Sequence, residues 1–123
     1  MKSNAIKEKS FAFALEAIAL YKLLIAKNEY VLSKQFLRSA TSIGANVEEA
    51  DAAISKKDFI SKMSVARKEA RETLYWLKLL EASEFIQHDF TEIKNHSEEL
   101  IKILTAIVKT SQQNLNPLLN ITH

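Results

Sequence analysis

Residues 55–81, SKKDFISKMSVARKEARETLYWLKLLE, decide the fold class of this chain. Apolar residues recur in this stretch at steps of three and four, the spacing of one helical face, and no Gly or Pro interrupts it. Ser55 is a suitable N-cap residue, and Asp58 stands in the first turn. The predicted buried seam consists of Phe59, Met63, Ala66, Ala70, Thr73 or Leu74, Leu77, and Leu80 or Glu81.

The same helix carries seven of the seventeen basic residues of the chain. At about 100° per residue, all but one of these bases fall within an arc of roughly 120° beside the seam, while Asp58, Glu69 and Glu72 lie on its other side. The bases in the arc, called the basic flank below, are Lys56, Lys57, Arg67, Lys68, Arg71 and Lys78. Such an arc can neutralise the phosphates of RNA or DNA. A solvated helix face is the alternative interpretation, and it is the commoner one for an isolated monomer.

Three further helices are predicted at about residues 3–27, 31–54 and 89–113, in addition to the helix at 55–82. The connections between them are short, so consecutive helices should be antiparallel neighbours. The sequence therefore predicts an all-α, antiparallel up-down-up-down four-helix bundle over residues 1–113. The remaining core stripes are Ile6, Ser10, Phe13, Ala17, Leu20 and Leu24, then Phe36, Ala40, Ile43, Val47, Ala50 and Ile54, and finally Ile93, Ser97, Leu100, Leu104, Ile107 and Ser111.

Residues 114–123 form a predicted C-terminal tail, because Pro117 disfavours helix at the residue before it. We expect this tail to be loosely held or to pack on a neighbouring subunit.

The helix at 31–54 poses two local questions. Gly44 costs about 1 kcal/mol relative to Ala inside a helix, which suggests a close approach by another helix, or else a local bend. Glu48 lies near the edge of the packed seam, where a carboxylate favours a charged partner. Arg67 and Arg71 are candidate partners for Glu48, and a solvated acidic helix end is the alternative.

The first helix is apolar nearly all round, which is unusual for a helix with one side in a bundle core. Phe11, Leu15, Ile18 and Ile25 form a second apolar stripe beside the core stripe. We predict that Phe11, Leu15 and Ile18 contribute to a subunit interface. Tyr75 and Trp76 on the third helix are assigned to the same interface. The alternative is a wide core face with scattered surface alanines.

The amino-acid composition limits which cellular compartment and which class of binding partner we expect. There is no Cys, which excludes disulfides and thiolate metal sites and is compatible with a reducing cytosol. Residues 11–25 are strongly apolar, but Glu16 and Lys22 interrupt them and they fall short of the roughly 18 residues a membrane span needs. We therefore expect a cytoplasmic protein without a membrane partner. The net charge of +2 is small for a nucleic-acid binder, so the distribution of charge matters more than its sum.

Catalytic motifs are absent from the sequence. A di-iron bundle needs Glu-x-x-His motifs, and the chain has none. Glu92 and His96 stand four residues apart and could hold one metal ion weakly, but a solvated helical pair is the favoured interpretation. One glycine cannot form a phosphate-binding loop. We predict no enzyme activity, no metal and no cofactor.

Several segments together resemble a known bacterial family. LRSATSIGANVEEA at residues 37–50, followed by the quoted stretch at 55–81, resembles the four-helix-bundle proteins encoded by intervening sequences in 23S ribosomal RNA genes, often labelled S23 ribosomal proteins. FAFALEAIALYKLL at 11–24 and YVLSKQFLRSATSIG at 30–44 also fit, so the resemblance covers about residues 3–110. Arg67 is a departure, because a bulkier aromatic residue is common there in the family.

The resemblance implies a homopentamer of up-down bundles. The related accessory protein of diversity-generating retroelements is likewise pentameric and binds nucleic acid through a basic surface. By that similarity, the basic flank is expected to contact RNA or DNA without sequence specificity. The alternative is a protein-interaction scaffold, which would present Tyr75, Trp76 or the tail to a protein partner.

Overall fold

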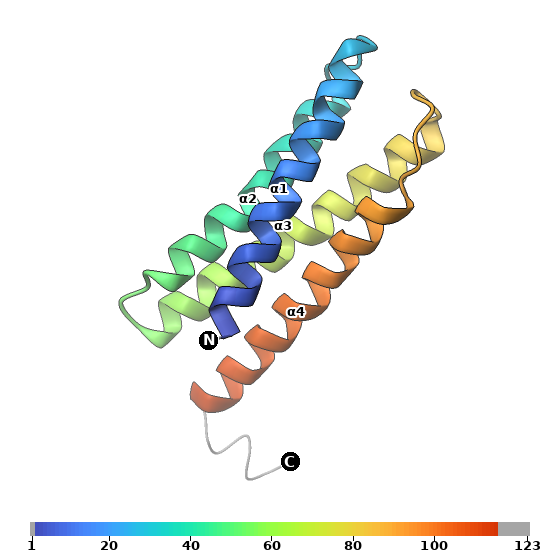
Figure 1. Cartoon of the computed structure of the whole chain (residues 1–123). Helices are drawn as coiled ribbons and strands as arrows, with labels where there is room; N and C mark the ends of the chain where they lie inside the picture. Colours follow the sequence, from blue (N-terminus) through green and yellow to red (C-terminus); the bar gives the residue numbers. More distant parts are fainter. Residues whose placement is uncertain (1, 116–123) are drawn as a thin grey trace.

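A computed structural model describes residues 2–115, with side chains from residue 5 onward. This part of the chain forms four α-helices: α1 (Lys2–Ala26), α2 (Leu32–Asp51), α3 (Lys56–Ser83) and α4 (Thr91–Leu115). Figure 1 shows them side by side, with the chain reversing direction at each connection. The predicted all-α up-down-up-down bundle is confirmed. Helix α4 runs two residues into the predicted tail, and residues 116–123 lie outside the described part.

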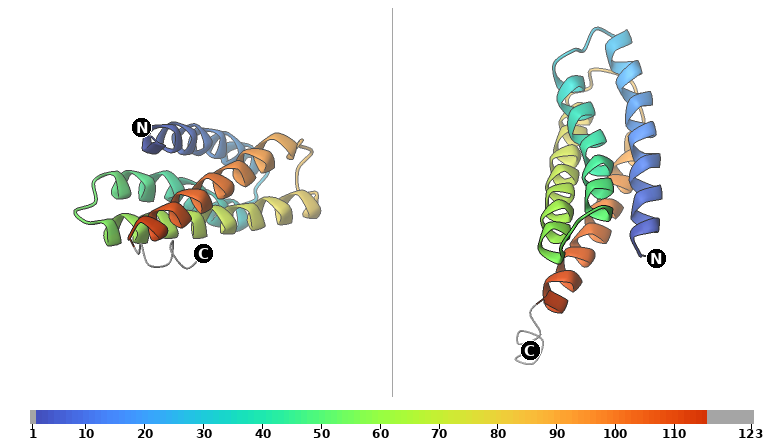
Figure 2. Two further views of the ribbon diagram at one scale, coloured as in Figure 1. Left: turned by 90° about the horizontal axis from the view of Figure 1, so that it is seen from below. Right: turned by 90° about the vertical axis from the view of Figure 1, so that its left-hand side faces the viewer.

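Each helix packs on two neighbours, in the order α1, α2, α3, α4 and back to α1. The α2–α3 interface is the most extensive and the α1–α4 interface the least. Within residues 2–115, α1 and α3 do not pack on each other, and neither do α2 and α4. The helices therefore follow one another around the bundle, as at the corners of a square. Figure 2 shows the bundle from two further sides. Helices α1 and α3 occupy opposite corners.

The core consists largely of the predicted stripes. The six stripe residues of α1 are buried, as are Phe36 to Ala50 of the α2 stripe. In α3, the sequence left the choice open between Thr73 and Leu74 and between Leu80 and Glu81, and the buried residues are Thr73 and Leu80. Phe59 is partly buried. In α4, Val108 replaces Ile107 as the buried residue near the end of the stripe. The helical period of 3.6 drifts from a strict heptad over this length, which accounts for that shift.

Ile54 is a correction to the predicted core. Its side chain is 97% exposed because α2 ends at Asp51, three residues before the predicted end, so Ile54 lies in the α2–α3 turn. The heptad pattern continues past the helix end by coincidence of spacing. Ser55 then accepts a 3.1 Å hydrogen bond from the backbone N–H of Asp58, which confirms it as the N-cap of α3.

The start of α2 is capped by a residue that no sequence signal singles out. The carboxylate of Glu29 accepts hydrogen bonds from the backbone N–H groups of Val31, Leu32 and Ser33 at 3.1, 3.1 and 2.5 Å. The Ser33 hydroxyl donates back to the Glu29 carbonyl oxygen at 2.6 Å. Glu29 is buried at the end of the bundle. One side chain thus satisfies three of the four unpaired N–H groups at this helix end.

Gly44 lies where α1 and α2 approach closely. A Cβ atom added at Gly44 would lie 3.4 Å from the Ser10 hydroxyl and 3.5 Å from the Ser10 carbonyl oxygen. The predicted close approach is confirmed, at ordinary van der Waals distance.

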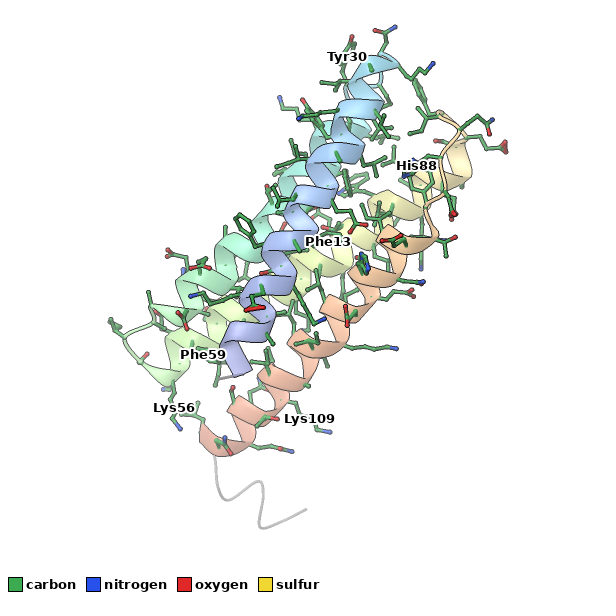
Figure 3. The ribbon with its side chains drawn as sticks, viewed as in Figure 1. Phe13, Tyr30, Lys56, Phe59, His88 and Lys109 are labelled. Atoms are coloured by element: carbon green, nitrogen blue, oxygen red, sulfur yellow. The ribbon has the colours of Figure 1, made fainter. Side chains whose placement is uncertain are left out.

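The α1–α4 seam is partly open. Near the start of α1, an apolar cleft of about 530 Å³ separates Ala5 from α4, and it is lined by Phe59, Met63, Ile103, Ala106 and Ile107 among others. Figure 3 shows Lys56 and Lys109 at this end of the bundle, while Tyr30 and His88 mark the connections at the opposite end. Side-chain contacts along the seam therefore matter for holding α1 against α4.

Candidate functional site

The basic flank lies on the outside of α3, directed away from the core. Arg67 is partly buried, and the other five members, Lys56, Lys57, Lys68, Arg71 and Lys78, are exposed. Among residues 2–115, none of the six makes a side-chain hydrogen bond or an ion pair. Their charges are therefore uncompensated by direct contacts within the described protomer.

Three of the four acidic residues of α3 are, by contrast, engaged by neighbouring helices. Arg38 of α2 donates to Glu69 at 3.2 Å and also to Glu72, whose carboxylate accepts a further 3.0 Å hydrogen bond from the indole of Trp76. Lys94 of α4 lies 2.6 Å from Glu81. These contacts partly neutralise acids that would otherwise offset the basic flank. The helix thus presents a net positive outer side.

Glu48 is paired with neither predicted arginine. Its carboxylate lies 3.7 Å from the ammonium of Lys7 on α1, which also donates to Asp51 at 3.0 Å. The hydrogen bond to Asp51, together with the attraction of Asp51 and Glu48, raises the pKa of Lys7. Because α3 turns its acidic side towards α2, Arg67 and Arg71 face away from Glu48.

The predicted interface residues occupy two different surfaces. Phe11 and Leu15 on α1 are 67% and 55% exposed, and Tyr75 on α3 is 56% exposed. Ile18 is partly buried. Trp76 is also partly buried, where it packs against the core of its own chain and touches the Tyr75 ring edge-on. Since α1 and α3 stand at opposite corners, the predicted interface residues lie on two separate surfaces of the protomer. Tyr75 stands one helical turn from Arg71 and Lys78 of the basic flank.

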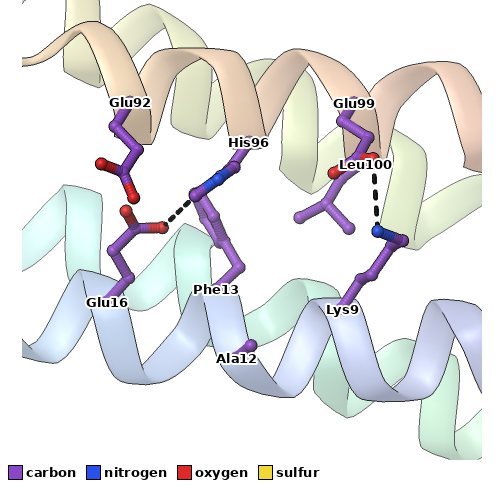
Figure 4. A pocket seen from close by; sticks show the side chains of 8 residues that line it. All are labelled: Lys9, Ala12, Phe13, Glu16, Glu92, His96, Glu99 and Leu100. Carbon is purple, nitrogen blue, oxygen red and sulfur yellow. Dashed lines mark hydrogen bonds and ion pairs between the residues drawn. The ribbon is translucent and has the colours of Figure 1, made fainter.

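A polar cluster bridges the α1–α4 seam around an open pocket of about 320 Å³ (Figure 4). His96 Nδ1 lies 2.8 Å from the Glu16 carboxylate, and Lys9 lies 3.3 Å from Glu99. The hydrogen bond to Glu16, aided by the negative charges of Glu16, Glu92 and Glu99, raises the pKa of His96 against an opposing effect of burial. Figure 4 shows the carboxylates of Glu16 and Glu92 facing each other beside the ring.

Sequence reasoning paired Glu92 with His96 but missed Glu16. Glu16 is 80 residues away from His96 along the chain, and it entered the sequence analysis only as a charge interrupting an apolar run. Its position opposite His96 follows from how α1 and α4 pack. The predicted pair of Glu92 and His96 on α4 is therefore part of a three-residue group that also includes Glu16 of α1.

Within residues 2–115, no helix combines the length and apolar character that crossing a membrane requires.

Comparison with known proteins gives a consistent result. A family model described as 23S rRNA-intervening sequence protein matches residues 2–106. The crystal structure of a protein with unknown function from the S23 ribosomal protein family of Bacteroides thetaiotaomicron is similar to this chain, with 50% sequence identity and a TM-score of 0.85. The match covers 89% of this chain and 99% of that one. No curated protein matches the chain.

Proposed function

Because this chain belongs to the 23S rRNA-intervening sequence protein family, a family without an established activity, we propose that it is a non-enzymatic homo-oligomer that binds RNA or DNA through the basic flank of α3. The binding is without base specificity, since Lys and Arg contacts to phosphate position a nucleic acid but do not read it. Such a role belongs in the cytoplasm.

The observation that carries the proposal is the uneven pairing of charges on α3. Glu69 and Glu72 share an ion pair with Arg38, and Glu81 is paired with Lys94, both from neighbouring helices. All six bases of the flank remain without a polar partner among the described residues. A row of unpaired bases on one helix can exchange its counterions for phosphates, which is the main source of non-specific nucleic-acid affinity.

The separation of the two predicted interface surfaces supports a ring. A surface on α1 that includes Phe11 and Leu15 and a surface on α3 around Tyr75 lie on opposite corners of one protomer. Contact between two unlike surfaces is heterologous, and heterologous contacts form a ring when the rotation between subunits closes. Five subunits is the number that resemblance to the family implies. A ring also repeats the basic flank, so weak contacts are multiplied through effective concentration.

The decisive experiment is size-exclusion chromatography with light scattering, with and without a structured RNA fragment, at low and moderate salt. The proposal expects a mass near five protomers and co-migration with RNA that weakens as salt rises. The variant Arg67→Glu/Lys68→Glu/Arg71→Glu should remain assembled but no longer co-migrate with RNA. The matched control, Lys34→Glu/Lys102→Glu/Lys109→Glu, changes the net charge equally at exposed sites outside the flank and should retain most RNA binding.

Assembly is tested separately with Leu15→Arg, which should reduce the mass to that of smaller species. Phe85→Arg is the control, because Phe85 is 50% exposed in the α3–α4 connection outside the proposed interface. Equal loss of RNA in both triple variants would count against the basic flank. An assembled ring that ignores RNA would favour the alternative, a protein-interaction scaffold presenting Tyr75.

A further inference from the structure

We propose that Glu16, Glu92 and His96 form a binding site for one divalent transition-metal ion, of the Zn²⁺ type, that clamps α1 to α4. Each of the three side chains offers a ligand atom, and these atoms all lie within 4.8 Å of one another. One imidazole nitrogen and two carboxylate oxygens, completed by water, are a ligand set that Zn²⁺ accepts. Figure 4 shows the three groups converging from two helices.

The charges in the pocket favour a cation. Lys9, the basic residue that lines it, is engaged by Glu99 at 3.3 Å. Glu92 has no hydrogen-bond or ion-pair partner among residues 2–115, and its carboxylate lies close to that of Glu16. Two carboxylates this close repel each other, and the single imidazole of His96 carries at most one positive charge, which cannot offset both. A divalent ion can do so, and the imidazole favours Zn²⁺ over Mg²⁺ or Ca²⁺, which prefer oxygen ligands.

The geometry needs only a small adjustment. Ligands about 2 Å from a shared metal ion lie roughly 3 to 3.5 Å apart, so a pair separated by the full 4.8 Å must close by roughly 1.3 to 1.8 Å. Side-chain rotation suffices, because Glu16 and His96 have 29% and 44% of their side chains exposed. Phe13, Ala12 and Leu100 line the same pocket and provide an apolar wall beside the ligands. That wall lowers the local dielectric and strengthens the metal–carboxylate attraction.

The competing ligand is the proton. A metal ion binds an imidazole nitrogen only when that nitrogen carries no proton, so the metal ion and the proton compete for His96. Affinity for the metal should therefore increase as the pH rises. The groups facing the imidazole are Glu16 and Lys9 on α1 and Glu92 and Glu99 on α4.

The site would act on the weakest interface of the bundle. Helices α1 and α4 share the least extensive packing, and an ion held by ligands from both adds a direct link between them. A ligand that binds the folded state alone raises its stability in proportion to the logarithm of ligand concentration. Zn²⁺ should thus raise the melting temperature of the protein.

The test is isothermal titration calorimetry and thermal denaturation of the full chain, stripped with chelator, using Zn²⁺ at pH 7.5 and 5.5. We expect saturation at one ion per chain at pH 7.5, a higher melting temperature, and much weaker binding at pH 5.5. The same concentration of Mg²⁺ should have little effect. Glu16→Gln, Glu92→Gln and His96→Ala should each weaken Zn²⁺ binding by at least about tenfold, since even residues that only orient metal ligands contribute that much.

Two matched controls separate a built site from surface binding. Glu98→Gln removes an exposed carboxylate of α4, and His123→Ala removes a histidine, but neither alters the three proposed ligands. Both controls should bind Zn²⁺ like the parent. Binding without saturation, or affinity unchanged in Glu16→Gln and Glu92→Gln, would overturn the site. The outcome is independent of nucleic-acid binding, because the cluster lies on the α1–α4 seam and not on the basic flank.

Discussion

Glu84 is a residue whose backbone conformation does not suit its side chain. It ends α3 with φ 54° and ψ 30°, the left-handed conformation, and its N–H bonds the carbonyl of Glu81. A side chain costs about 1–2 kcal/mol in this region, which is why glycine is common after helices. Asn28, after α1, adopts a similar φ of 67°, but asparagine tolerates it better.

We predict that Glu84→Gly stabilises the protein. Glycine relieves the left-handed strain in the folded state, and this stabilisation exceeds the destabilisation caused by the greater conformational freedom of the unfolded chain. The free energy of unfolding should therefore increase by about 0.5–1 kcal/mol. Chemical denaturation measures the change. Glu49→Gly, at an exposed position within α2, should lower stability by about 1 kcal/mol. A loss at both positions would mean that Glu84 is not strained.

His96 should make stability depend on pH. Its pKa is raised in the folded state by the hydrogen bond to Glu16, so protonation stabilises the folded protein. This contribution is fully present below the unfolded value of about 6.5 and is lost as the pH rises through the raised folded pKa. In chelator, the stability difference between the parent and His96→Gln should therefore be larger at pH 5.5 than at pH 8.5.

A double-mutant cycle identifies the partner of His96. If Glu16 is responsible, His96→Gln should have a much smaller pH-dependent effect in a Glu16→Gln background. An undiminished effect there would assign the pKa shift to Glu92 or Glu99.

At the scale of the helix, Glu29 fixes where α2 begins. Its buried carboxylate accepts three backbone N–H groups at the positive end of the helix dipole. We predict that Glu29→Ala destabilises the protein by about 1–2 kcal/mol, the usual cost of losing an N-cap. Glu29→Gln should cost less, because an amide oxygen still accepts. Denaturant unfolding of both variants, with Glu49→Ala as a near-neutral control, tests this.

The helices themselves could be predicted from sequence because their cores are periodic. Phe36 to Ala50 and Met63 to Leu80 repeat at three and four residues, and burial enforces that spacing. Their ends were less predictable. Ile54 continued the pattern beyond Asp51, and Glu29 was missed because Ser, Thr, Asp and Asn are the recognised cap residues. Single-sequence patterns carry local information, and a glutamate that folds back as a cap has no local signature.

The site residues were predictable from sequence where they lie on one helix, and not where they come from two. The basic flank lies on one helix, so its arc could be worked out from residue numbers alone. The group of Glu16, Glu92 and His96 spans two helices at opposite ends of the sequence, and only their packing brings it together. Glu48 was given the wrong candidate partners for the same reason, since Lys7 comes from a helix whose rotation the sequence leaves undetermined.

At the scale of the whole molecule, the basic flank gives a quantitative signature. If all six bases contact phosphates, the logarithm of RNA affinity should fall with the logarithm of salt concentration with a slope of about −4 to −5 per subunit. The Arg67→Glu/Lys68→Glu/Arg71→Glu variant should reduce the magnitude of that slope by at least about 2. Fluorescence anisotropy across a salt series measures both. An unchanged slope would place the phosphate contacts elsewhere.

The open α1–α4 seam also has a consequence for how the protomer folds. Glu16 and His96 are 80 residues apart, and Lys9 and Glu99 are 90 apart, so these contacts close the longest loops among the side-chain hydrogen bonds of the described residues. Long loops are entropically costly, and such contacts are expected to form after the crossing of the folding barrier. Variants that weaken the seam should then accelerate unfolding and leave the folding rate nearly unchanged. The α1–α4 seam would then determine the unfolding rate of the protomer, and the α2–α3 hairpin would determine its folding rate.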